Sequence, residues 1–187
     1  KRVYEVAVPT KATKLAGVNI LGSYLEELDG VGTGRADASR YHKLIFNILK
    51  SIFENSLRKP RIEEILAEET QRADITFENR RESGFFRQLD EGYHITCPTI
   101  FIECKNYAGD VGNPEFSQIQ NRLNKIRGQF GIIVCRNIVD RAKAKARQRN
   151  LKNDEKYVVV LTDADIKRLV KLKIGGKHEE IDDFVEG

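Results

Sequence analysis

The chain has 187 residues, of which 40% are hydrophobic and 32% are charged, and its formal net charge is +4 at pH 7. This length predicts one domain, with room for an appendage. No apolar run approaches the length of a membrane span, so we expect no membrane partner. The mild positive charge permits a polyanionic partner without requiring one.

The cysteine pattern predicts the redox environment. Cys97, Cys104 and Cys135 are odd in number and have no CxxC spacing. We therefore expect neither a disulfide framework nor a zinc site, and we expect a reducing, cytoplasmic location. A lysine at the first position and the absence of methionine lead us to expect a piece of a longer protein that has further domains.

Residues 1–37 are expected to form an N-terminal appendage or linker, or the end of a preceding domain. Residues 2–8 are consistent with a short strand and residues 14–28 with a short helix. The glycine-rich stretch 30–34 lacks the Lys-Ser/Thr of a P-loop, so we interpret it as a flexible linker rather than a phosphate-binding loop. The main domain is expected over 38–175, and an acidic tail, either a short helix or disordered, over 176–187.

The first half of the main domain predicts a helix followed by three strands. Apolar residues recur every three or four positions over 39–57, which indicates a helix capped by Ser39. Two strands are expected at 61–68 and 72–79, although a helical turn at 61–68 is an alternative. The apolar run from Thr99 to Lys105 predicts the third strand.

The second half alternates helices and strands. Asn113 is expected to cap a helix whose apolar stripe includes Ile126. Strands are expected at 129–136 and 157–161, with a helix at 140–150 between them. A last helix, capped by Thr162 or Asp163, ends at Gly175-Gly176. This order of elements predicts an α/β sandwich with a mixed sheet.

Charged residues end the third strand. Side chains two positions apart in a strand share a face, so Glu103 and Lys105 point the same way while Cys104 points into the opposite core. If the strand carrying Asp74 is a neighbour, two carboxylates and an ammonium come together. Such oxygen ligands suit Mg²⁺ or Mn²⁺, and the ammonium could hold a water nucleophile or neutralise a phosphate. This group of residues is suited to phosphodiester hydrolysis.

The segments RADITF, TIFIECKNY and NPEFSQIQNRL resemble the PD-(D/E)XK nuclease superfamily. The resemblance implies the restriction-endonuclease-like fold, a three-layer α/β sandwich in which helices flank a mixed central sheet. It also implies that Asp74, Glu103 and Lys105 are the catalytic signature and that Gln118, in the following helix, assists them. The chain has Ala73 where the family name has proline.

The same resemblance implies a divalent metal, Mg²⁺ or Mn²⁺, held by Asp74, Glu103 and the backbone carbonyl of Cys104. Some members add a glutamate from the first core helix. Glu54 is the candidate here, with Glu63 or Glu64 as alternatives.

The function implied is a metal-dependent endonuclease that cleaves DNA, with RNA as the alternative substrate, acting as a homodimer or within a larger restriction or antiphage defence protein. One alternative is a catalytically inactive nucleic-acid-binding or assembly module of the same fold. A nucleotide sensor that uses the loop at 30–34 ranks third.

Basic residues suggest where nucleic acid would bind. The segment 140–152 is rich in lysine and arginine, and such a run is either a phosphate-binding surface or a solvated helix face. The residues predicted to contact nucleic acid are Arg122, Arg141, Lys145 and Arg149.

Overall fold

The computed structural model describes residues 11–66, 71–80 and 82–186. None of the described helices is long and apolar enough to cross a membrane. The helices are α1 (Lys11–Gly30), α2 (Ala38–Ile52), α3 (Gly84–Glu91), α4 (Asn113–Arg122), α5 (Arg141–Asn153), α6 (Asp163–Ile174) and α7 (His178–Glu186). The strands are β1 (Leu57–Leu66), β2 (Gln71–Asn79), β3 (Thr99–Lys105), β4 (Phe130–Cys135) and β5 (Tyr157–Thr162).

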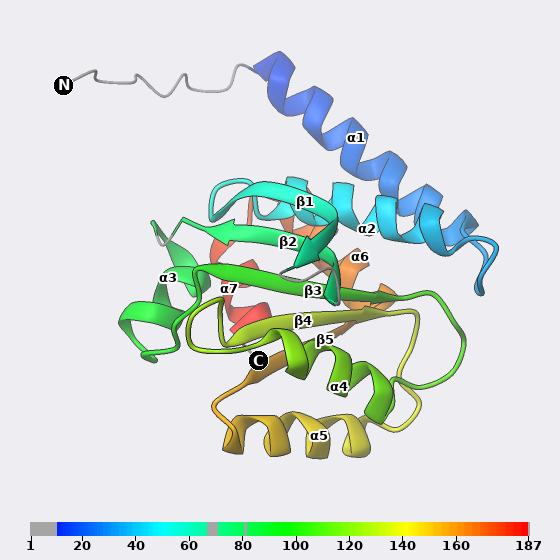
Figure 1. The fold of residues 1–187 in the computed structure, drawn as a ribbon. Helices are drawn as coiled ribbons and strands as arrows, with labels where there is room; N and C mark the ends of the chain where they lie inside the picture. The colour runs from blue at the N-terminus through cyan, green and yellow to red at the C-terminus, as the bar shows by residue number, and fades with distance from the viewer. Residues whose placement is uncertain (1–10, 67–70, 81, 187) are drawn as a thin grey trace.

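The strands form one mixed sheet in the order β1-β2-β3-β4-β5 (Figure 1). The β1–β2 and β2–β3 pairs are antiparallel, whereas β3, β4 and β5 are parallel. Parallel neighbours need a crossover, and α4 and α5 supply the two crossovers. The predicted α/β class with a mixed central sheet is therefore confirmed.

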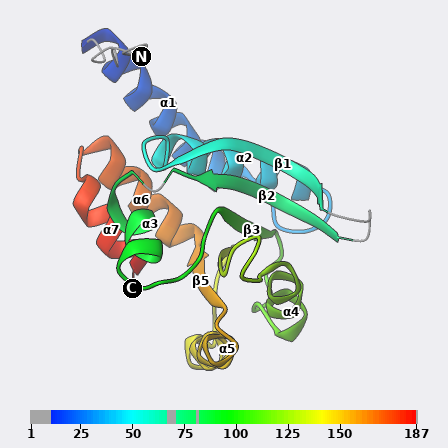
Figure 2. The same ribbon diagram turned by 60° about the vertical axis from the view of Figure 1, so that its left-hand side comes forward.

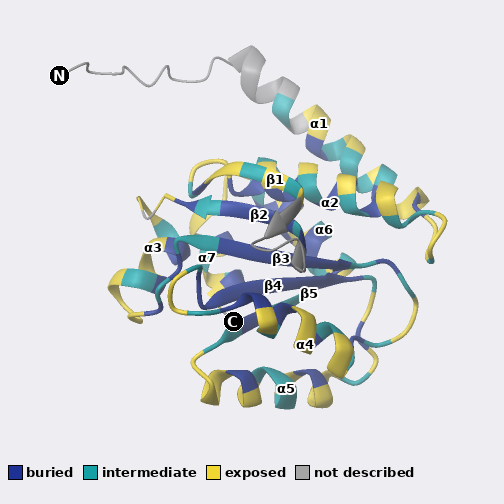
Figure 3. Ribbon diagram, in the orientation of Figure 1, coloured by how far each residue is buried: buried dark blue, intermediate teal, exposed yellow. Residues whose placement is uncertain are grey.

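Each face of the sheet is covered by helices, which gives three layers (Figures 1 and 2). On the first face, called the α2 face, strand residues such as Ile102 pack with buried side chains of α2 and α6. On the second, called the α4 face, Phe101 and Ile133 pack with Ile119 of α4 and Leu151 of α5. Figure 3 shows the central strands as the most continuously buried part of the molecule. Successive residues of β3 thus alternate between two cores, as the strand period requires.

Helix α1 packs against α2 and α6, and its residues Leu21 and Leu28 are buried in the α2-face core. The glycine-rich stretch that follows is bonded to the end of β3. Asn106 Nδ2 donates to the carbonyls of Gly32 and Gly34 at 3.0 Å each, and Gly34 N donates to the Asn106 carbonyl. The strand expected over 2–8 lies outside the described residues, and the domain boundary at residue 37 stays a prediction.

The structure corrects several element boundaries. Helix α2 ends at Ile52 rather than near residue 57, and 61–66 is strand rather than a helical turn. The cap of α4 is Gly112 rather than Asn113, because the Gly112 N–H donates to Glu115 Oε2 at 2.6 Å. Helix α4 also ends at Arg122, which leaves Ile126 88% exposed instead of in the predicted stripe.

Helix α3 was not predicted, because the glycines at its two ends indicated a loop. Its eight residues bury Phe85, Phe86 and Leu89 against the core. Thr162 rather than Asp163 caps α6, with its hydroxyl accepting from Asp165 N. The acidic tail is helical over His178–Glu186, so the helix alternative was correct there.

Candidate active site

Strand pairing brings the two predicted carboxylates together. Strands β2 and β3 pair from Glu78 opposite Thr99 to Ile75 opposite Ile102, and Asp74 and Glu103 are the next residues of their strands. Asp74 Oδ2 also accepts a hydrogen bond from the backbone N–H of Cys104 at 2.9 Å. The expected adjacency of the two strands is confirmed.

Glu103 is buried, with 3% of its side chain exposed, and it forms ion pairs with two cations. Lys105 Nζ donates to its Oε1 at 2.6 Å. Arg122, at the end of α4, donates from Nη1 to its Oε2. A buried carboxylate requires such partners, because desolvation of a lone charge costs several kcal/mol.

Helix α4 supplies the second partner of the lysine. Gln118 Oε1 accepts from Lys105 Nζ at 2.8 Å, so Gln118 and Glu103 hold the ammonium from two sides. The helix reaches this position because it packs over Gly131 of β4. A Cβ placed on Gly131 would lie 2.6 Å from Ile119 Cδ1, inside contact distance. Because glycine has no side chain, Gly131 allows α4 to pack this close to the sheet.

Burial dominates the electrostatics of the site. It lowers the pKa of the Arg122 guanidinium, an effect that the charge of Asp74 opposes. Burial also raises the pKa of the Cys104 thiol well above its usual value, and the Asp74 charge adds to this effect. Cys104 points into the α2-face core, as predicted, so its thiol does not face the carboxylates.

A supporting contact lies at the start of α4. Burial alone would raise the pKa of Glu115, but hydrogen bonds from Tyr107 and from the Gly112 N–H, together with the charge of Lys105, leave that pKa below its ordinary value. Burial and the contact with Glu115 raise the pKa of Tyr107. Glu115 thus caps α4 through the Gly112 N–H, and its negative charge also interacts with Lys105. Glu115 is an acidic residue in the first turn of α4, where the positive end of a helix favours it, and its contact with Tyr107 was not apparent in the sequence.

The donor set fits a divalent cation that keeps several water ligands. Mg²⁺ is commonly bound through one or two carboxylates, and Asp74 and Glu103 supply two. Asp74 Oδ1 accepts no hydrogen bond from any described residue, whereas both oxygens of Glu103 already contact cations. The described residues contain no cluster of three or more His, Cys, Asp or Glu side chains that could hold a metal ion. Any ion would thus rely on the carboxylate pair, a backbone carbonyl and water.

The structure does not bring Glu54 to this group. Glu54 follows α2 on the other face of the sheet, where its side chain is 60% exposed and pairs with Lys173 Nζ at 3.0 Å. The prediction that Glu54 is an extra metal ligand is therefore wrong. Of the two alternatives, Glu63 has a β1 position opposite Asp74 when the β1–β2 register is followed. The side chain of Glu64 lies outside the described residues.

The predicted nucleic-acid contacts separate into two places. Arg122 is buried beside Glu103, so the prediction that it contacts nucleic acid is wrong, and its role is internal. Arg141, Lys145 and Arg149 are exposed on α5 and line a groove along β5. The burial of the Arg122 side chain was not apparent in the sequence. Helical periodicity does not show whether an arginine near the end of a helix is buried or exposed.

Comparison with known proteins gives one structural likeness. No family model and no curated protein matches the chain. The MspJI restriction endonuclease, solved in complex with a 27-mer oligonucleotide, resembles it with a TM-score of 0.43 and 17% sequence identity. The likeness covers 100% of this chain and 40% of that protein, so this chain spans less than half of its length.

Proposed function

We propose that this protein is a nuclease that hydrolyses phosphodiester bonds of DNA with the help of a divalent metal. The observation that carries the proposal is the hydrogen bond that Asp74 Oδ2 accepts from the backbone N–H of Cys104, next to Glu103, with Lys105 Nζ 2.6 Å from Glu103 Oε1. Two neighbouring carboxylates and an amine suit this reaction, because a bound cation and an oriented water both accelerate hydrolysis of a phosphodiester. Mg²⁺ or Mn²⁺ is the metal implied.

Asp74, Glu103 and the Cys104 carbonyl are the residues that would hold the metal. When bound, the metal would supply Lewis-acid activation of water and stabilise negative charge on the phosphate. Lys105 has three N–H donors, of which Glu103 and Gln118 accept two. The third can be donated to a water nucleophile or to a phosphate oxygen. Gln118 acts as a positioning residue, because it fixes the direction of the ammonium.

The test is cleavage of supercoiled plasmid and of labelled linear DNA in Mg²⁺, Mn²⁺ or EDTA. We expect cutting with metal, none in EDTA, and loss of at least about a hundredfold in rate for Lys105→Ala and Asp74→Ala. Lys171→Ala, which removes an exposed lysine of α6, is the matched control and should cut normally. Circular dichroism establishes that each variant is folded. Cutting that survives in EDTA or in folded Lys105→Ala would contradict the proposal.

A second function is favoured by one observation. Both oxygens of Glu103 are taken by Lys105 and Arg122, as expected for a module that keeps the fold without cleaving. Such a protein would bind DNA and leave it intact in every metal. Fluorescence anisotropy with labelled DNA and labelled RNA, run beside the cleavage assay, separates the two functions and also identifies the preferred nucleic acid.

Two further expectations are a homodimer and a role in restriction or antiphage defence. A homodimer would place two such sites on opposite strands of a duplex, and a restriction or antiphage defence role would follow from sequence-selective cutting. Sedimentation of the protein with and without duplex DNA tests the dimer, which we expect at least in the presence of DNA. A monomer on DNA that cuts only one strand would contradict it.

A further inference from the structure

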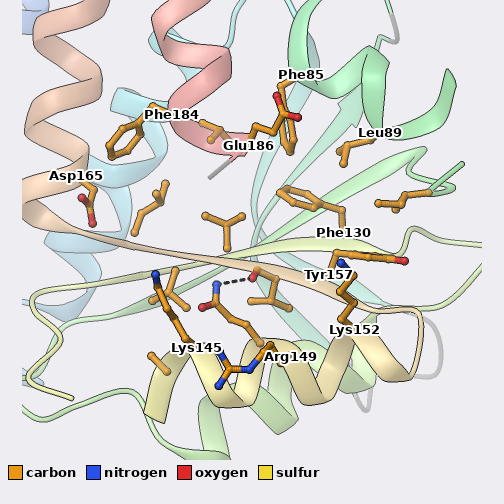
Figure 4. A pocket seen from close by; sticks show the side chains of 18 of the residues that line it. Phe85, Leu89, Phe130, Lys145, Arg149, Lys152, Tyr157, Asp165, Phe184 and Glu186 are labelled. Atoms are coloured by element: carbon orange, nitrogen blue, oxygen red, sulfur yellow. Dashed lines mark hydrogen bonds between the residues drawn. The ribbon is translucent and has the colours of Figure 1, made fainter. Parts of the chain in front are cut away.

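A groove of about 760 Å³ runs along β5, the last strand of the sheet, away from the carboxylate pair (Figure 4). Helix α5 forms one wall, and side chains of α3 and α7 contribute to the other. In Figure 4, Lys145, Arg149 and Lys152 lie on the helix on one side of the strand, and Phe85, Phe184 and Glu186 lie on the other side. Neither wall includes Asp74, Glu103 or Lys105, although Arg141, Lys145 and Arg149 of the α5 wall are residues predicted to contact nucleic acid.

The free edge of β5 has open backbone groups. Tyr157 N donates to Gln129 O on the β4 side, so Val158, Val160 and Thr162 direct their backbone groups away from β4. Gln148 Nε2 donates to the Val158 carbonyl at 2.8 Å, and Thr162 N donates to an Asp165 carboxylate oxygen at 2.8 Å. Side chains therefore close both ends of this edge. Between them, the N–H and carbonyl groups of Val160 have no partner among the described residues, and the Val158 N–H, on the outer side of the Gln148 contact, has none either.

The α5 wall has uncompensated positive charge. Arg141, Lys145, Arg149 and Lys152 line the groove, all exposed, and none of them pairs with a carboxylate among the described residues. The first three follow one another at four-residue steps, about 6 Å along a helix axis. Alternate residues of an extended strand are about 6.6 Å apart, a close match. A strand laid along β5 would thus bring every second side chain to one of these cations.

The opposite wall is apolar where an added strand would face it. Phe85, Phe184 and Val185 line it. The two carboxylates there are already engaged, since Asp165 accepts from Thr162 and Glu186 accepts from the Tyr93 hydroxyl. Side chains of an added strand alternate between the two faces of the sheet. Acidic residues would therefore meet α5 while the intervening residues, if apolar, would meet α3 and α7.

We propose that this groove binds an extended segment of a partner protein, in which acidic and apolar residues alternate, as a sixth strand on β5. Main-chain hydrogen bonds to Val158 and Val160 would give affinity, and the cations of α5 together with the apolar wall would give sequence preference. Nucleic acid is the less favoured occupant, because phosphates would use the cations but neither the open backbone edge nor the apolar wall.

The probe is a fluorescein-labelled peptide of about nine residues that alternates Glu and Val, measured by fluorescence anisotropy with the full chain. We expect saturable binding that weakens with salt. A peptide of the same composition with its Glu and Val residues in separate blocks, and one that alternates Lys and Val, should bind at least about tenfold more weakly. Equal binding of the block peptide would overturn the proposal.

Two kinds of change locate the binding. The double variant Lys145→Glu/Arg149→Glu should weaken binding at least about tenfold, whereas Lys43→Glu/Lys50→Glu, a matched double reversal of exposed lysines on α2, should leave it unchanged. A peptide that is N-methylated at alternate amides keeps its side chains but cannot pair with β5 and should not bind. Unchanged binding of that peptide would overturn strand addition without any change to the protein.

Three further measurements distinguish a bound peptide from nucleic acid and from a second copy of the chain. Amide exchange of Val160 should slow at least about tenfold in the peptide complex. If an oligothymidine binds with the same dependence on Lys145 and Arg149 while the peptide does not bind, the groove is a nucleic-acid site and the proposal is wrong. If sedimentation shows a dimer that the peptide does not dissociate, β5 pairs with a second copy instead. Each readout is independent of DNA cleavage, so failure here leaves the nuclease proposal standing.

Discussion

Arg122 of α4 and Glu103 of β3 form an ion pair inside the protein, beside the Cys104 N–H that bonds Asp74. Lys105 contacts the other oxygen of the same carboxylate. One buried anion thus lies between two cations that come from different elements. This arrangement holds the carboxylate in one position, since each of its oxygens contacts a cation.

Removing Arg122 should destabilise the fold. In Arg122→Met, Glu103 loses the guanidinium that contacts one of its oxygens while remaining buried, and loss of one partner of a buried pair typically costs about 3–5 kcal/mol. The double variant Arg122→Met/Glu103→Leu should recover most of this loss. Urea unfolding measures both values. A loss below about 1 kcal/mol in the single variant would show that the pair is not desolvated.

Gln118→Ala should lower the rate of DNA cleavage with little effect on binding. The Lys105 ammonium would lose the acceptor 2.8 Å away and sample other directions, and misplacement of a catalytic group commonly costs about tenfold to a hundredfold in kcat. KM should stay unchanged, because Gln118 is not expected to bind substrate directly. The neighbouring exposed residue provides the control, Ser117→Ala, whose kcat should match that of the unaltered protein.

Stability should depend on Glu115 in acid. Its pKa is lowered in the folded protein, so the unfolded chain binds this proton more tightly. The stabilisation is therefore fully present above the ordinary value of 4.5 and is lost as the pH falls through the lowered pKa. Glu115→Gln should unfold with a weaker pH dependence below about pH 5 and should be about 1 kcal/mol less stable at pH 7.

Tyr107→Phe provides an independent check on the Glu115 prediction. It removes one hydrogen bond to Glu115 and keeps the Gly112 contact, so the pH dependence should fall between those of the other two proteins. The measurement is the free energy of unfolding by urea at several pH values. Parallel curves for all three proteins would mean that Glu115 titrates alike in the folded and unfolded states.

The cysteines should resist modification in the native protein. Cys97, Cys104 and Cys135 are free and buried. Burial raises the pKa of Cys135 to about 12, with the charges of Asp163, Asp165 and Asp110 adding to the effect, and burial also raises the pKa of Cys104 well above its usual value. We expect no thiol to react with a disulfide reagent at about pH 8 until denaturant is added, because the thiolate is the reactive species. Ser117→Cys should add one fast-reacting thiol.

Gly131→Ala should affect both stability and the candidate site. Its new methyl group would press on Ile119 and on the Phe101 carbonyl, and such overpacking costs about 1–3 kcal/mol. Because α4 carries Gln118 and Arg122, a shift of the helix should also reduce cleavage. Gly22→Ala in α1, where a Cβ meets nothing within 4 Å, should be neutral or slightly stabilising. Equal behaviour of the two variants in urea would contradict the close packing of α4.

The sequence alone was sufficient for most of the element order and for the placement of Asp74, Glu103 and Lys105. Apolar periodicity and strand alternation are local properties, and they were enough to predict that Glu103 and Lys105 share a face opposite Cys104. Helix α3 was not predicted, because it is only eight residues long and begins at a glycine, which favours a turn. Tertiary packing of its apolar residues stabilises the helix despite this local preference.

Only the tertiary structure decided which distant residues meet. Pairing of β2 with β3 brought Asp74 to the backbone N–H of Cys104, beside Glu103, and the packing of α4 over Gly131 placed Arg122 inside the protein, away from the nucleic-acid surface predicted for it. Glu54 follows the end of α2 and forms an ion pair with Lys173 instead of approaching the carboxylates. Contacts of this kind depend on how helices pack against the sheet. The sequence around a charged residue is the same whether its side chain lies in solvent or forms a buried ion pair, so the sequence does not distinguish the two.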